Sequence, residues 1–551
     1  MPDLLTAAQM RAIERAAIDS GQVTGLELME RAGRGSVAAI LRRWPEFAKA
    51  PHRAAVLCGP GNNGGDGFVV ARLLKERGWD VEVFLYGQAH KLPPDAAENH
   101  RRWTQIGATS RFEDLVAPAA SAAADLVVDA VFGTGLARPV ADAIGDALNR
   151  AGAGAGTGAR SPAAVKVAID VPSGLCADSG RALGAVMASD LTVSFHSEKV
   201  GHRLSIGPGK CGAVCTVDIG LGHAKAASTD LCRLAVAGRD PTTGRHAVTG
   251  GKPVGDLHKY DHGHALILSG GPGRGGAARL AARGALRIGS GLVTVGCPPA
   301  ALQENAARLD AVMLRPLADA RALTGALADP RINALCLGPG LGVSDRTRAL
   351  VLAALAPRVP GLTQDPDPSD TTPGGPGAGA GARSATVLDA DALTAFAEDP
   401  QTLFDALHPD CVLTPHAGEF RRLFPDLHDR LTAPPSTGPA YSKLDATRDA
   451  AARAGCTVLF KGADTVIADP AGRAVINSAH YDRAAPWLAT AGSGDVLAGF
   501  VTGLLARGFT PVAAAETAAW LHVECARHFG PGLIAEDLPE QLPAVFRALD
   551  P

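Results

Sequence analysis

The sequence predicts an α/β protein of two large domains, each built on a mostly parallel sheet. Apolar runs of strand length alternate with helical segments through most of the 551 residues, the pattern of strands joined by crossover helices. This alternation is lost around residues 222–253, so a linker or domain junction is expected there. The hydrophobic content of 46% is ample for two cores. By length alone the chain suits two large α/β domains or three to four domains of about 150 residues.

Each apolar run gives a specific strand prediction. In the first half, strands are expected at residues 54–58, 81–86, 126–132, 165–171, 191–195 and 213–219. In the second half they are expected at residues 265–269, 292–297, 334–337, 386–388, 411–414 and 457–460. Long alanine-rich helices are expected at residues 276–289 and 511–529. The chain has no short-period repeat, which excludes a solenoid.

Composition restricts the kinds of molecule that the protein is expected to bind and the compartment in which it is expected to work. The formal net charge is −3 and no block of Lys or Arg occurs, which argues against nucleic acid or an anionic membrane. The 10 cysteines are scattered without a C-x-x-C pair, as in proteins of a reducing compartment. No signal segment or membrane-length apolar run occurs, so a soluble cytoplasmic protein is expected. The tracts 151–162 and 360–384, rich in Gly, Ala and Pro, are interpreted as surface insertions.

The residues that follow each strand matter most, because ligands of open parallel sheets bind beyond the carboxyl ends of the strands. The strand ending at Cys58 runs into GPGNNGGDG, residues 59–67, which holds five glycines and opens a helix. Glycines let the backbone approach a ligand closely, so this loop is predicted to cradle a phosphate or a dinucleotide. It matches neither G-x-G-x-x-G nor G-x-x-x-x-G-K-[ST], and a tight structural turn is the alternative.

Oxygen ligands are predicted to converge from three strand ends of the first half. They are Asn63, Asp129 and Ser173. Amide, carboxylate and hydroxyl oxygens of this kind suit an alkali or alkaline-earth ion. Any one of them could instead cap a turn. The combination of all three favours a cation site.

The most informative stretch of the second half is ATAGSGDVLAG, residues 489–499. Small residues there lead into an apolar helix, whose first N–H groups and dipole would attract a phosphate. Asp495 lies in this first turn, where its charge would repel such a ligand. A chemical role explains its presence, since it could take the proton of a hydroxyl that attacks a phosphoryl group. The alternative is an ordinary helix start in which Asp495 complements the dipole.

Other strand ends of the second half supply GPGLG at 338–342, DAD at 389–391, TPHAGE at 414–419 and KGADT at 461–465. The ammonium of Lys461 could lie beside a nucleotide. Two further patterns are given less weight. GPGRGG at 271–276 lacks the ribose-binding acid at the end of the next strand, so a dinucleotide-binding Rossmann domain is not expected there. The three histidines at 258–264 are interpreted as a polar loop rather than a zinc site.

The motifs GPGNNGGDG, DAVFGTGLARP and DVPSG together resemble the NAD(P)H-hydrate epimerase family, the YjeF N-terminal domain, over roughly residues 1–220. The resemblance implies a Rossmann-like three-layer domain and a potassium ion held by Asn63, Asp129 and Ser173. Asp170 is the candidate proton-transfer residue. Lys91 is either its basic partner or a solvated surface lysine, with the latter slightly favoured. Implied substrate contacts are Asn62, Asn63, Gly64, Gly65, Asp66, Gly133, Thr134, Gly135, Leu136, Ala137, Arg138, Pro139 and Asp170.

From His258 onward, the motifs HK…GH, GPGLG, LDADAL, LTPHAGEF, KG-x-x-T and TAGSGDVLAG resemble the ADP-dependent NAD(P)H-hydrate dehydratases of the ribokinase-like superfamily. The resemblance implies a ribokinase-like α/β/α domain, a magnesium ion, and ADP or ATP as co-substrate. The insertion before Thr386 and the segment Ala485-Pro486-Trp487 depart from the family pattern without removing a catalytic group. Implied nucleotide contacts are Lys461, Gly462, Ala463, Asp464, Thr465 and Gly494, and implied contacts to the hydrated nicotinamide are Ala277, Gly340, His416 and Asp495.

Together the resemblances imply a bifunctional enzyme that repairs NADH or NADPH hydrated across the C5–C6 double bond. An epimerase domain is expected over 1–221, a linker over 222–252, and a dehydratase domain over 253–551 with a low-complexity insertion near 360–384. The expected partners are the hydrated cofactors and ADP, with no nucleic acid and no membrane, and a homo-oligomer is expected. One alternative is a ribokinase-like kinase of a small vitamin alcohol or sugar. Another is a first half that only binds nucleotide.

Overall fold

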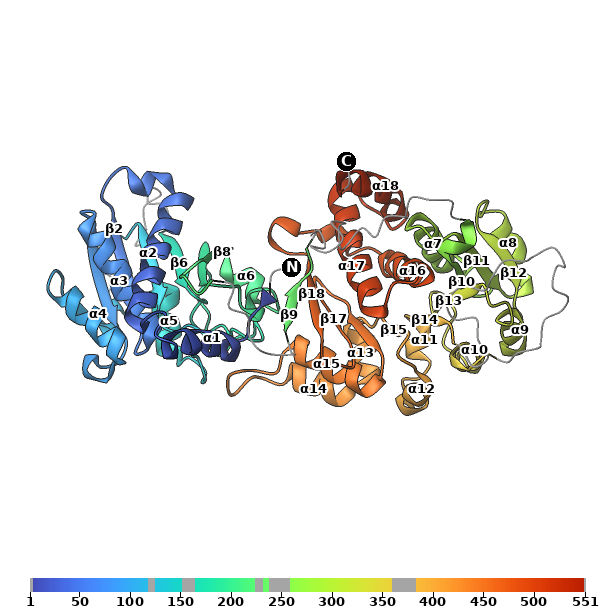
Figure 1. Ribbon diagram of the computed structural model, residues 1–551, viewed down its shortest axis with the longest axis horizontal. Coiled ribbons are helices and arrows are strands. Elements are labelled where there is room, and N and C mark those ends of the chain that lie inside the picture. The colour runs from blue at the N-terminus through green and yellow to red at the C-terminus, as the bar shows by residue number, and fades with distance from the viewer. Residues whose placement is uncertain are drawn as a thin grey trace. The chain divides into compact units, whose positions relative to one another are not determined.

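The computed structural model describes residues 3–116, 124–150, 164–222, 231–236, 258–358 and 383–549. They form two compact units (Figure 1). The smaller unit comprises Pro2–Cys232 with Ala433–Lys443, and the larger unit mainly comprises Arg233–Thr432 and Leu444–Pro551. Most of the expected linker, 222–252, lies outside the described residues, as do the tract 151–162 and nearly all of 360–384.

A parallel sheet of seven strands in the order β4-β3-β2-β5-β6-β7-β8 forms the centre of the smaller unit. Every neighbouring pair in it is parallel, so the carboxyl ends of all its strands lie along one edge. The strand predictions of the first half are confirmed to within two residues. The strands are β2 (Arg53–Cys58), β3 (Asp80–Leu85), β4 (Thr109–Arg111), β5 (Leu126–Ala130), β6 (Val165–Ile169), β7 (Leu191–Phe195) and β8 (Ala213–Val217).

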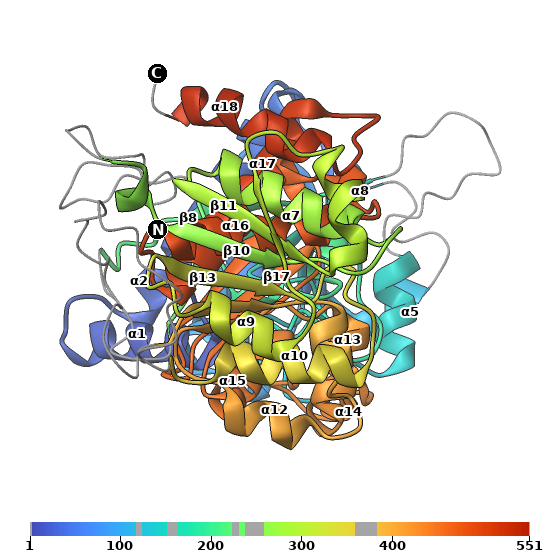
Figure 2. The same cartoon turned by 90° about the vertical axis from the view of Figure 1, so that its right-hand side faces the viewer.

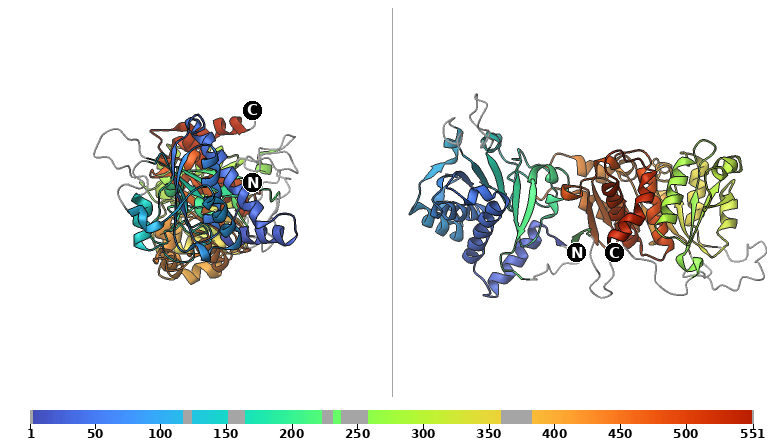
Figure 3. Two further views of the ribbon diagram at one scale, coloured as in Figure 1. Left: turned by 90° about the vertical axis from the view of Figure 1, so that its left-hand side faces the viewer. Right: turned by 90° about the horizontal axis from the view of Figure 1, so that it is seen from above.

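Helices cover both faces of the smaller sheet. Alternate residues of β2 point to opposite faces, as strand geometry requires. Ala54, Val56 and Cys58 join the core under α1 (Ala7–Asp19), α2 (Gly25–Arg43), α3 (Asn62–Glu76) and α4 (Pro94–Thr104). Ala55 and Leu57 join a second core under α5 (Asp142–Arg150). Figure 3 shows helices of the first hundred residues, coloured blue, beside this sheet. Shorter elements are α6 (Gly207–Cys211), η1 (Pro45–Ala48), η2 (Ala89–Lys91), η3 (Phe112–Val116) and η4 (Val200–His202).

The larger unit has a mixed sheet in which β18-β17-β16-β15-β14-β13-β10-β11-β12 are successive neighbours. Its strands from β16 to β12 are parallel, whereas β17 and β18 run antiparallel at one side. The parallel strands are β10 (His264–Leu268), β11 (Leu292–Cys297), β12 (Met313–Pro316), β13 (Ile332–Leu337), β14 (Ala385–Leu388), β15 (Cys411–Leu413) and β16 (Thr457–Phe460). The antiparallel strands are β17 (Asp464–Ala468) and β18 (Ala474–Ser478). Two short strands elsewhere in the described chain are β1 (Asp3–Leu4) and β9 (Cys232–Leu234).

Helices also lie on both faces of the larger sheet, which confirms the predicted three-layer α/β architecture. Figure 2 shows α7, α16 and α17 on one face and α9 and α10 on the other. The helices are α7 (Gly276–Arg287), α8 (Leu302–Ala306), α9 (Ala320–Ala326), α10 (Asp345–Leu355), α11 (Asp391–Thr394), α12 (Pro400–Ala406), α13 (Ala417–Leu423), α14 (Pro425–Thr432), α15 (Lys443–Ala454), α16 (Ser493–Ala506), α17 (Pro511–Phe529) and α18 (Asp537–Leu549), with the short turns η5 (Lys259–His262), η6 (Pro299–Ala301), η7 (Tyr481–Arg483) and η8 (Pro486–Leu488).

Helix α16 is buried from Val496 to Ala506, as expected for a helix that is apolar on all sides. Two glycines allow it to lie directly against α7. A Cβ at Gly499 would come within 2.1 Å of the carbonyl oxygen of Ala281, and a Cβ at Gly503 within 2.5 Å of Ile288 Cγ2. This close packing fixes the position at which α16 begins. Among the described residues, no helix has the length and apolarity that a membrane crossing requires.

We expect Gly499→Ala to destabilise the larger unit, because its methyl group would push α16 away from the backbone of α7. Overpacking of this kind costs about 1–3 kcal/mol, which corresponds to a fall of several degrees in the melting temperature of a unit of this size. Gly325→Ala in α9 is the matched control, since a Cβ there would meet no atom within 4 Å. Thermal unfolding of the two variants measures the difference. Equal melting temperatures would contradict the prediction.

Candidate active sites

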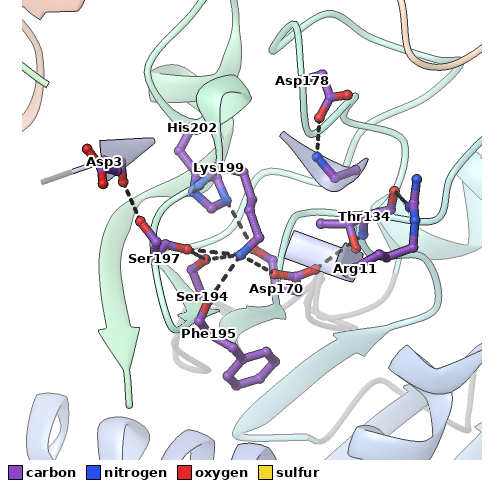
Figure 4. Close-up of polar contacts among 11 residues, drawn as sticks. Asp3, Arg11, Thr134, Asp170, Asp178, Ser194, Phe195, Ser197, Lys199 and His202 are labelled. Carbon is purple, nitrogen blue, oxygen red and sulfur yellow. Dashed lines mark hydrogen bonds and ion pairs between the residues drawn. The ribbon is translucent and has the colours of Figure 1, made fainter. Parts of the chain in front are cut away.

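Asp170, just after β6, lies at the centre of the candidate site of the smaller unit. Its Oδ1 is 3.0 Å from Nζ of Lys199, and its Oδ2 accepts a hydrogen bond of 3.2 Å from the backbone N–H of Thr134 (Figure 4). Its backbone adopts a left-handed φ of 66°, and its carbonyl oxygen lies 3.0 Å from Nε2 of His202. A non-glycine residue held in this conformation by several partners is typical of a functional site.

Lys199 is the basic partner of Asp170. Its side chain is completely buried, so its ammonium group requires several polar partners. Besides Asp170, Nζ lies 2.9 Å from Ser194 Oγ and 2.9 Å from the carbonyl oxygen of Ser197. Lys91, by contrast, is exposed at the end of η2, which supports its interpretation as a surface lysine.

The charges of two further acids, Glu14 on α1 and Asp66 on α3, act on this pair. Burial raises the pKa of Asp66 well above its usual range, and the charge of Asp170 adds to the effect. Burial likewise raises the pKa of Glu14 to about 7, again with a contribution from Asp170. Burial opposes ionisation of Asp170 too, but the charge and hydrogen bond of Lys199, the charge of His202 and the hydrogen bond from Thr134 together hold the pKa of Asp170 below its usual value. An ionised carboxylate therefore lies near two acids that retain protons, an arrangement suited to acid–base chemistry.

The predicted substrate loops meet at Gly133. A Cβ there would lie 3.0 Å from Oδ1 of Asn63 and 3.2 Å from Oδ2 of Asp170. The Nδ2 group of Asn63 is buried and has no hydrogen-bond partner in the described part of the chain, so it is available to a ligand. Arg11 of α1 donates to the carbonyl oxygen of Thr134 at 3.3 Å. The other predicted contacts lie on the same two loops: Asn62, Gly64 and Gly65 at the start of α3, and Gly135, Leu136, Ala137, Arg138 and Pro139 on a partly exposed rim.

Two of the three predicted potassium ligands are in direct contact. Asp129 is completely buried, its Oδ1 is 2.6 Å from Ser173 Oγ, and its Oδ2 accepts a hydrogen bond of 2.8 Å from the backbone of Ser173. Burial raises the pKa of Asp129, although these hydrogen bonds oppose the shift. A cation would therefore stabilise the carboxylate. Together with the amide oxygen of Asn63, these oxygen donors fit an alkali ion.

In the larger unit, Asp495 lies in the first turn of α16 and directly follows the glycine-rich loop. Gly492 caps the helix with a left-handed φ of 88°. Burial raises the pKa of Asp495 to about 6, and the charges of Asp389, Asp391 and Glu419 contribute in the same direction. The charge of Lys461 opposes them. A carboxylate with this pKa can accept a proton near neutral pH and release it again, as a general base must.

Lys461 joins the charged residues of this site. Its Nζ lies 2.7 Å from Oδ1 of Asp389 and 3.9 Å from Oε2 of Glu419. Burial alone would lower the pKa of Lys461, but the two carboxylates raise it above its usual value, so the ammonium stays charged. A Cβ at Gly494 would be 3.5 Å from Nζ. Two predicted nucleotide contacts, Lys461 and Gly494, are therefore neighbours.

The other predicted nucleotide contacts form the turn into β17. The hydroxyl of Thr465 donates to the carbonyl oxygen of Gly462 at 2.7 Å, which closes the turn. Ala463 accepts a hydrogen bond of 2.7 Å from the backbone of Ala479, and Asp464 begins the strand. The turn thus holds Lys461 at the strand end that precedes it.

Residues predicted to contact the hydrated nicotinamide are distributed over several loops. Gly340 lies close to Ala277, since a Cβ at Gly340 would be 3.5 Å from the Cβ of Ala277. His416 is half exposed and caps α13 through its Nδ1, which accepts the N–H of Gly418 at 2.9 Å. The contact of these residues with the substrate stays a prediction.

Several functional candidates are absent from the sequence prediction: Lys199, Glu14, Asp389 and Glu419. Asp389 and Glu419 lie in motifs that were recognised, but only the fold brings them to Lys461. Lys199 follows the predicted strand 191–195. Its position just after a strand end is the feature of the sequence that marks it as a candidate site residue. Glu14 lies on a helix before the first long strand, and no local pattern marks it.

Comparisons with known proteins agree with this division into two units. The family model described as YjeF-related protein N-terminus matches residues 25–201, and the model described as NAD(P)H-hydrate dehydratase matches residues 265–368 and 379–542. The bifunctional NAD(P)H-hydrate repair enzyme Nnr of Salinibacter ruber is 33% identical, over 99% of this chain and 96% of the relative. This chain belongs to the bifunctional NAD(P)H-hydrate repair enzyme family.

Relatives of the separate halves also exist. The NAD(P)H-hydrate epimerase of Rhodobacter capsulatus is 50% identical over 37% of this chain and 92% of its own length. A solved structure of the ADP/ATP-dependent NAD(P)H-hydrate dehydratase from Bacillus subtilis, co-crystallised with ATP and Mg²⁺, is 25% identical, with a TM-score of 0.42 over 55% of this chain and 96% of that chain.

We expect Gly133→Ala to reduce epimerase activity at least tenfold, because its Cβ would enter the space between Asn63 and Asp170. The matched control is Gly209→Ala in α6 of the same unit, outside the predicted substrate contacts, where a Cβ would meet nothing within 4 Å. Epimerisation of one purified epimer of hydrated NADH, followed by chromatography, measures both variants. Equal rates for the two would show that Gly133 does not mark the reacting centre.

Proposed function

We propose that the chain repairs hydrated NADH and NADPH with two active sites. The smaller unit, with its domain over residues 1–221, interconverts the R and S epimers. The larger unit, with its domain over residues 253–551, dehydrates the S epimer with ADP and releases AMP and phosphate. The observation that carries this proposal is Asp495, a half-buried acid in the first turn of α16. Its pKa is raised to about 6, and its charge acts on the ammonium of Lys461.

In the proposed dehydration, Asp495 takes the proton from the C6 hydroxyl of the substrate, whose oxygen attacks the terminal phosphoryl group of ADP. The P–O bond to AMP breaks, and the C6 hydroxyl becomes a phosphate ester. The lone pair of the ring nitrogen then expels phosphate, and loss of a proton from C5 restores the C5–C6 double bond. Phosphate is a much better leaving group than hydroxide, which explains the use of a nucleotide. N–H groups at the start of α16 and the charge of Lys461 stabilise the negative charge that develops.

In the proposed epimerisation, the reacting carbon carries both a hydroxyl and the ring nitrogen. Asp170, kept ionised by Lys199, accepts the hydroxyl proton while the C6–N1 bond breaks and N1 is protonated. The aldehyde formed rotates about C5–C6, and the nitrogen adds to its other face. Glu14 and Asp66 are the candidate donors of the proton to N1, because both have raised pKa values. This assignment gives the two kinds of carboxyl opposite roles.

Two metal ions belong to the proposal. The oxygens of Asn63, Asp129 and Ser173 would hold potassium, which would balance the buried charge of Asp129. In the larger unit, the carboxylates around Asp495 outnumber the ammonium of Lys461 among the described residues, and this surplus charge suits a divalent cation. Asp389 and Glu419 would hold magnesium, which supplies charge neutralisation for the phosphates. The homo-oligomeric state and the cytoplasmic location expected from the sequence stay predictions.

The decisive test is a pair of isosteric substitutions in the full chain. We expect Asp495→Asn to lower dehydration by at least about 100-fold, the usual effect of losing a general base, and to leave epimerisation intact. We expect Asp170→Asn to have the reverse effect. Recovery of the reduced-nicotinamide absorbance with and without ADP measures the first reaction, and chromatography of the epimers the second. Full dehydratase turnover by Asp495→Asn would refute the role of this acid, and steady accumulation of a phosphorylated product would favour a kinase instead.

The pH dependence provides an independent check on Asp495. Since the base must be ionised and its pKa is about 6, kcat/KM of the dehydratase should rise through pH 6 and level off above pH 7. Asp391→Asn should move this rise to lower pH, because the charge of Asp391 raises the pKa of Asp495. The asparagine can still accept the hydrogen bond that Gly342 donates to Asp391. A rise that stays in place or moves to higher pH would contradict the assignment.

A further inference from the structure

His522 is a buried histidine that the proposed reactions do not use directly. It lies on α17, is 7% exposed, and packs edge-on against the ring of Phe500 in α16. Its Nε2 is 2.9 Å from the carbonyl oxygen of Ser493. A carbonyl oxygen only accepts hydrogen bonds, so Nε2 carries a proton and donates it. Burial lowers the pKa of His522 to about 4, which keeps the imidazole neutral around physiological pH.

Its acceptor is the first residue of α16, two positions before Asp495. In a trans peptide the carbonyl and the following N–H point in opposite directions. The hydrogen bond to Ser493 therefore also fixes the direction of the Gly494 N–H, which points towards the open N-terminal end of the helix. A Cβ at Gly494 would lie 3.5 Å from Nζ of Lys461, so this peptide borders the charged centre of the site.

The peptide needs external support because of its neighbours. Ser493 lies between Gly492 and Gly494, and glycines give the backbone more freedom to lose on ordering. The first turn of a helix also has N–H groups without partners inside the helix. Three bonds hold Ser493 from outside this turn. Its backbone N–H donates to the carbonyl oxygen of Thr490 at 3.4 Å, its hydroxyl donates to the carbonyl oxygen of Leu488 at 2.9 Å, and His522 donates to its carbonyl oxygen. Of these three, the bond from His522 comes from another long helix.

We infer that His522 is a positioning residue of the dehydratase site, whose Nε2–H group holds the Ser493–Gly494 peptide so that the N–H groups at the start of α16 face the phosphates of the nucleotide. The inference rests on the proposed function of this turn. Donors that are already oriented stabilise developing charge without reorganising during the reaction. If His522 merely filled the core, its loss would lower stability without a selective effect on nucleotide turnover.

The experiment compares three substitutions in the full chain. We expect His522→Leu to lower the dehydratase kcat/KM for ADP about tenfold, the order of effect of one oriented hydrogen bond. We expect His522→Gln to stay within about threefold of the unsubstituted chain, because its amide nitrogen reaches the position of Nε2. His264→Leu is the matched control, since His264 is also buried in the larger unit but begins β10, at the edge opposite the strand ends of the site, and bonds Thr294 Oγ1 at 2.7 Å. Epimerase activity should be unchanged in all three.

Two results would overturn the inference: a kcat/KM for His522→Leu equal to that of His264→Leu, or His522→Gln as impaired as His522→Leu. If His522→Leu does not fold, His522→Asn replaces it, since the shorter amide reaches only the position of Nδ1; equal activity of the Asn and Gln variants would then overturn the inference. Asp495→Asn separates this result from the proposed function. If Asp495→Asn is inactive while His522→Leu is fully active, only the role of His522 fails.

Discussion

Both units depend on one geometric constraint, the parallel arrangement of their central strands. Parallel strands end at the same edge of a sheet, so each loop that leaves this edge delivers its side chains to the same region. In the smaller unit, β6 and β7 bring Asp170 and Lys199 within 3.0 Å of each other, although 29 positions separate them in the sequence. In the larger unit, β14 and β16 do the same for Asp389 and Lys461. These charges can be buried because the topology supplies a partner for each.

The two sites use this pairing to opposite effect. In the smaller unit, the buried Lys199 keeps Asp170 ionised, and the nearby acids Glu14 and Asp66 retain their protons instead. In the larger unit, burial and the charges of the neighbouring carboxylates outweigh the charge of Lys461, so the pKa of Asp495 rises to about 6. Asp170, beside Lys199, therefore stays ionised at neutral pH. Asp495, near Lys461, has a pKa at which it can accept and release a proton.

Much of this architecture could be predicted from sequence. The runs at 191–195, 292–297 and 457–460 coincide with β7, β11 and β16, because buried parallel strands are continuous apolar segments. The antiparallel β17 and β18 were not predicted, since their polar and apolar residues give a weaker pattern. Loop glycines indicated where ligands bind, but the partners of Asp170 and Asp495 come from distant parts of the chain. Lys199 and His522 lie in ordinary-looking segments, and only the folded structure reveals what they contact.

The N-terminal helix has a consequence for how the smaller unit can be trimmed. The match to the epimerase family model starts at residue 25, yet Arg11 and Glu14 of α1 reach the site from before that point. The backbone of this segment also bonds the loop around Lys199, with Leu5 donating to Glu198 at 3.0 Å. A polypeptide cut back to the recognised family boundary would keep every strand of its sheet. It would nevertheless lose Glu14, whose charge acts on Asp170 and Lys199, and the backbone bond that ties the N-terminal segment to the loop before Lys199.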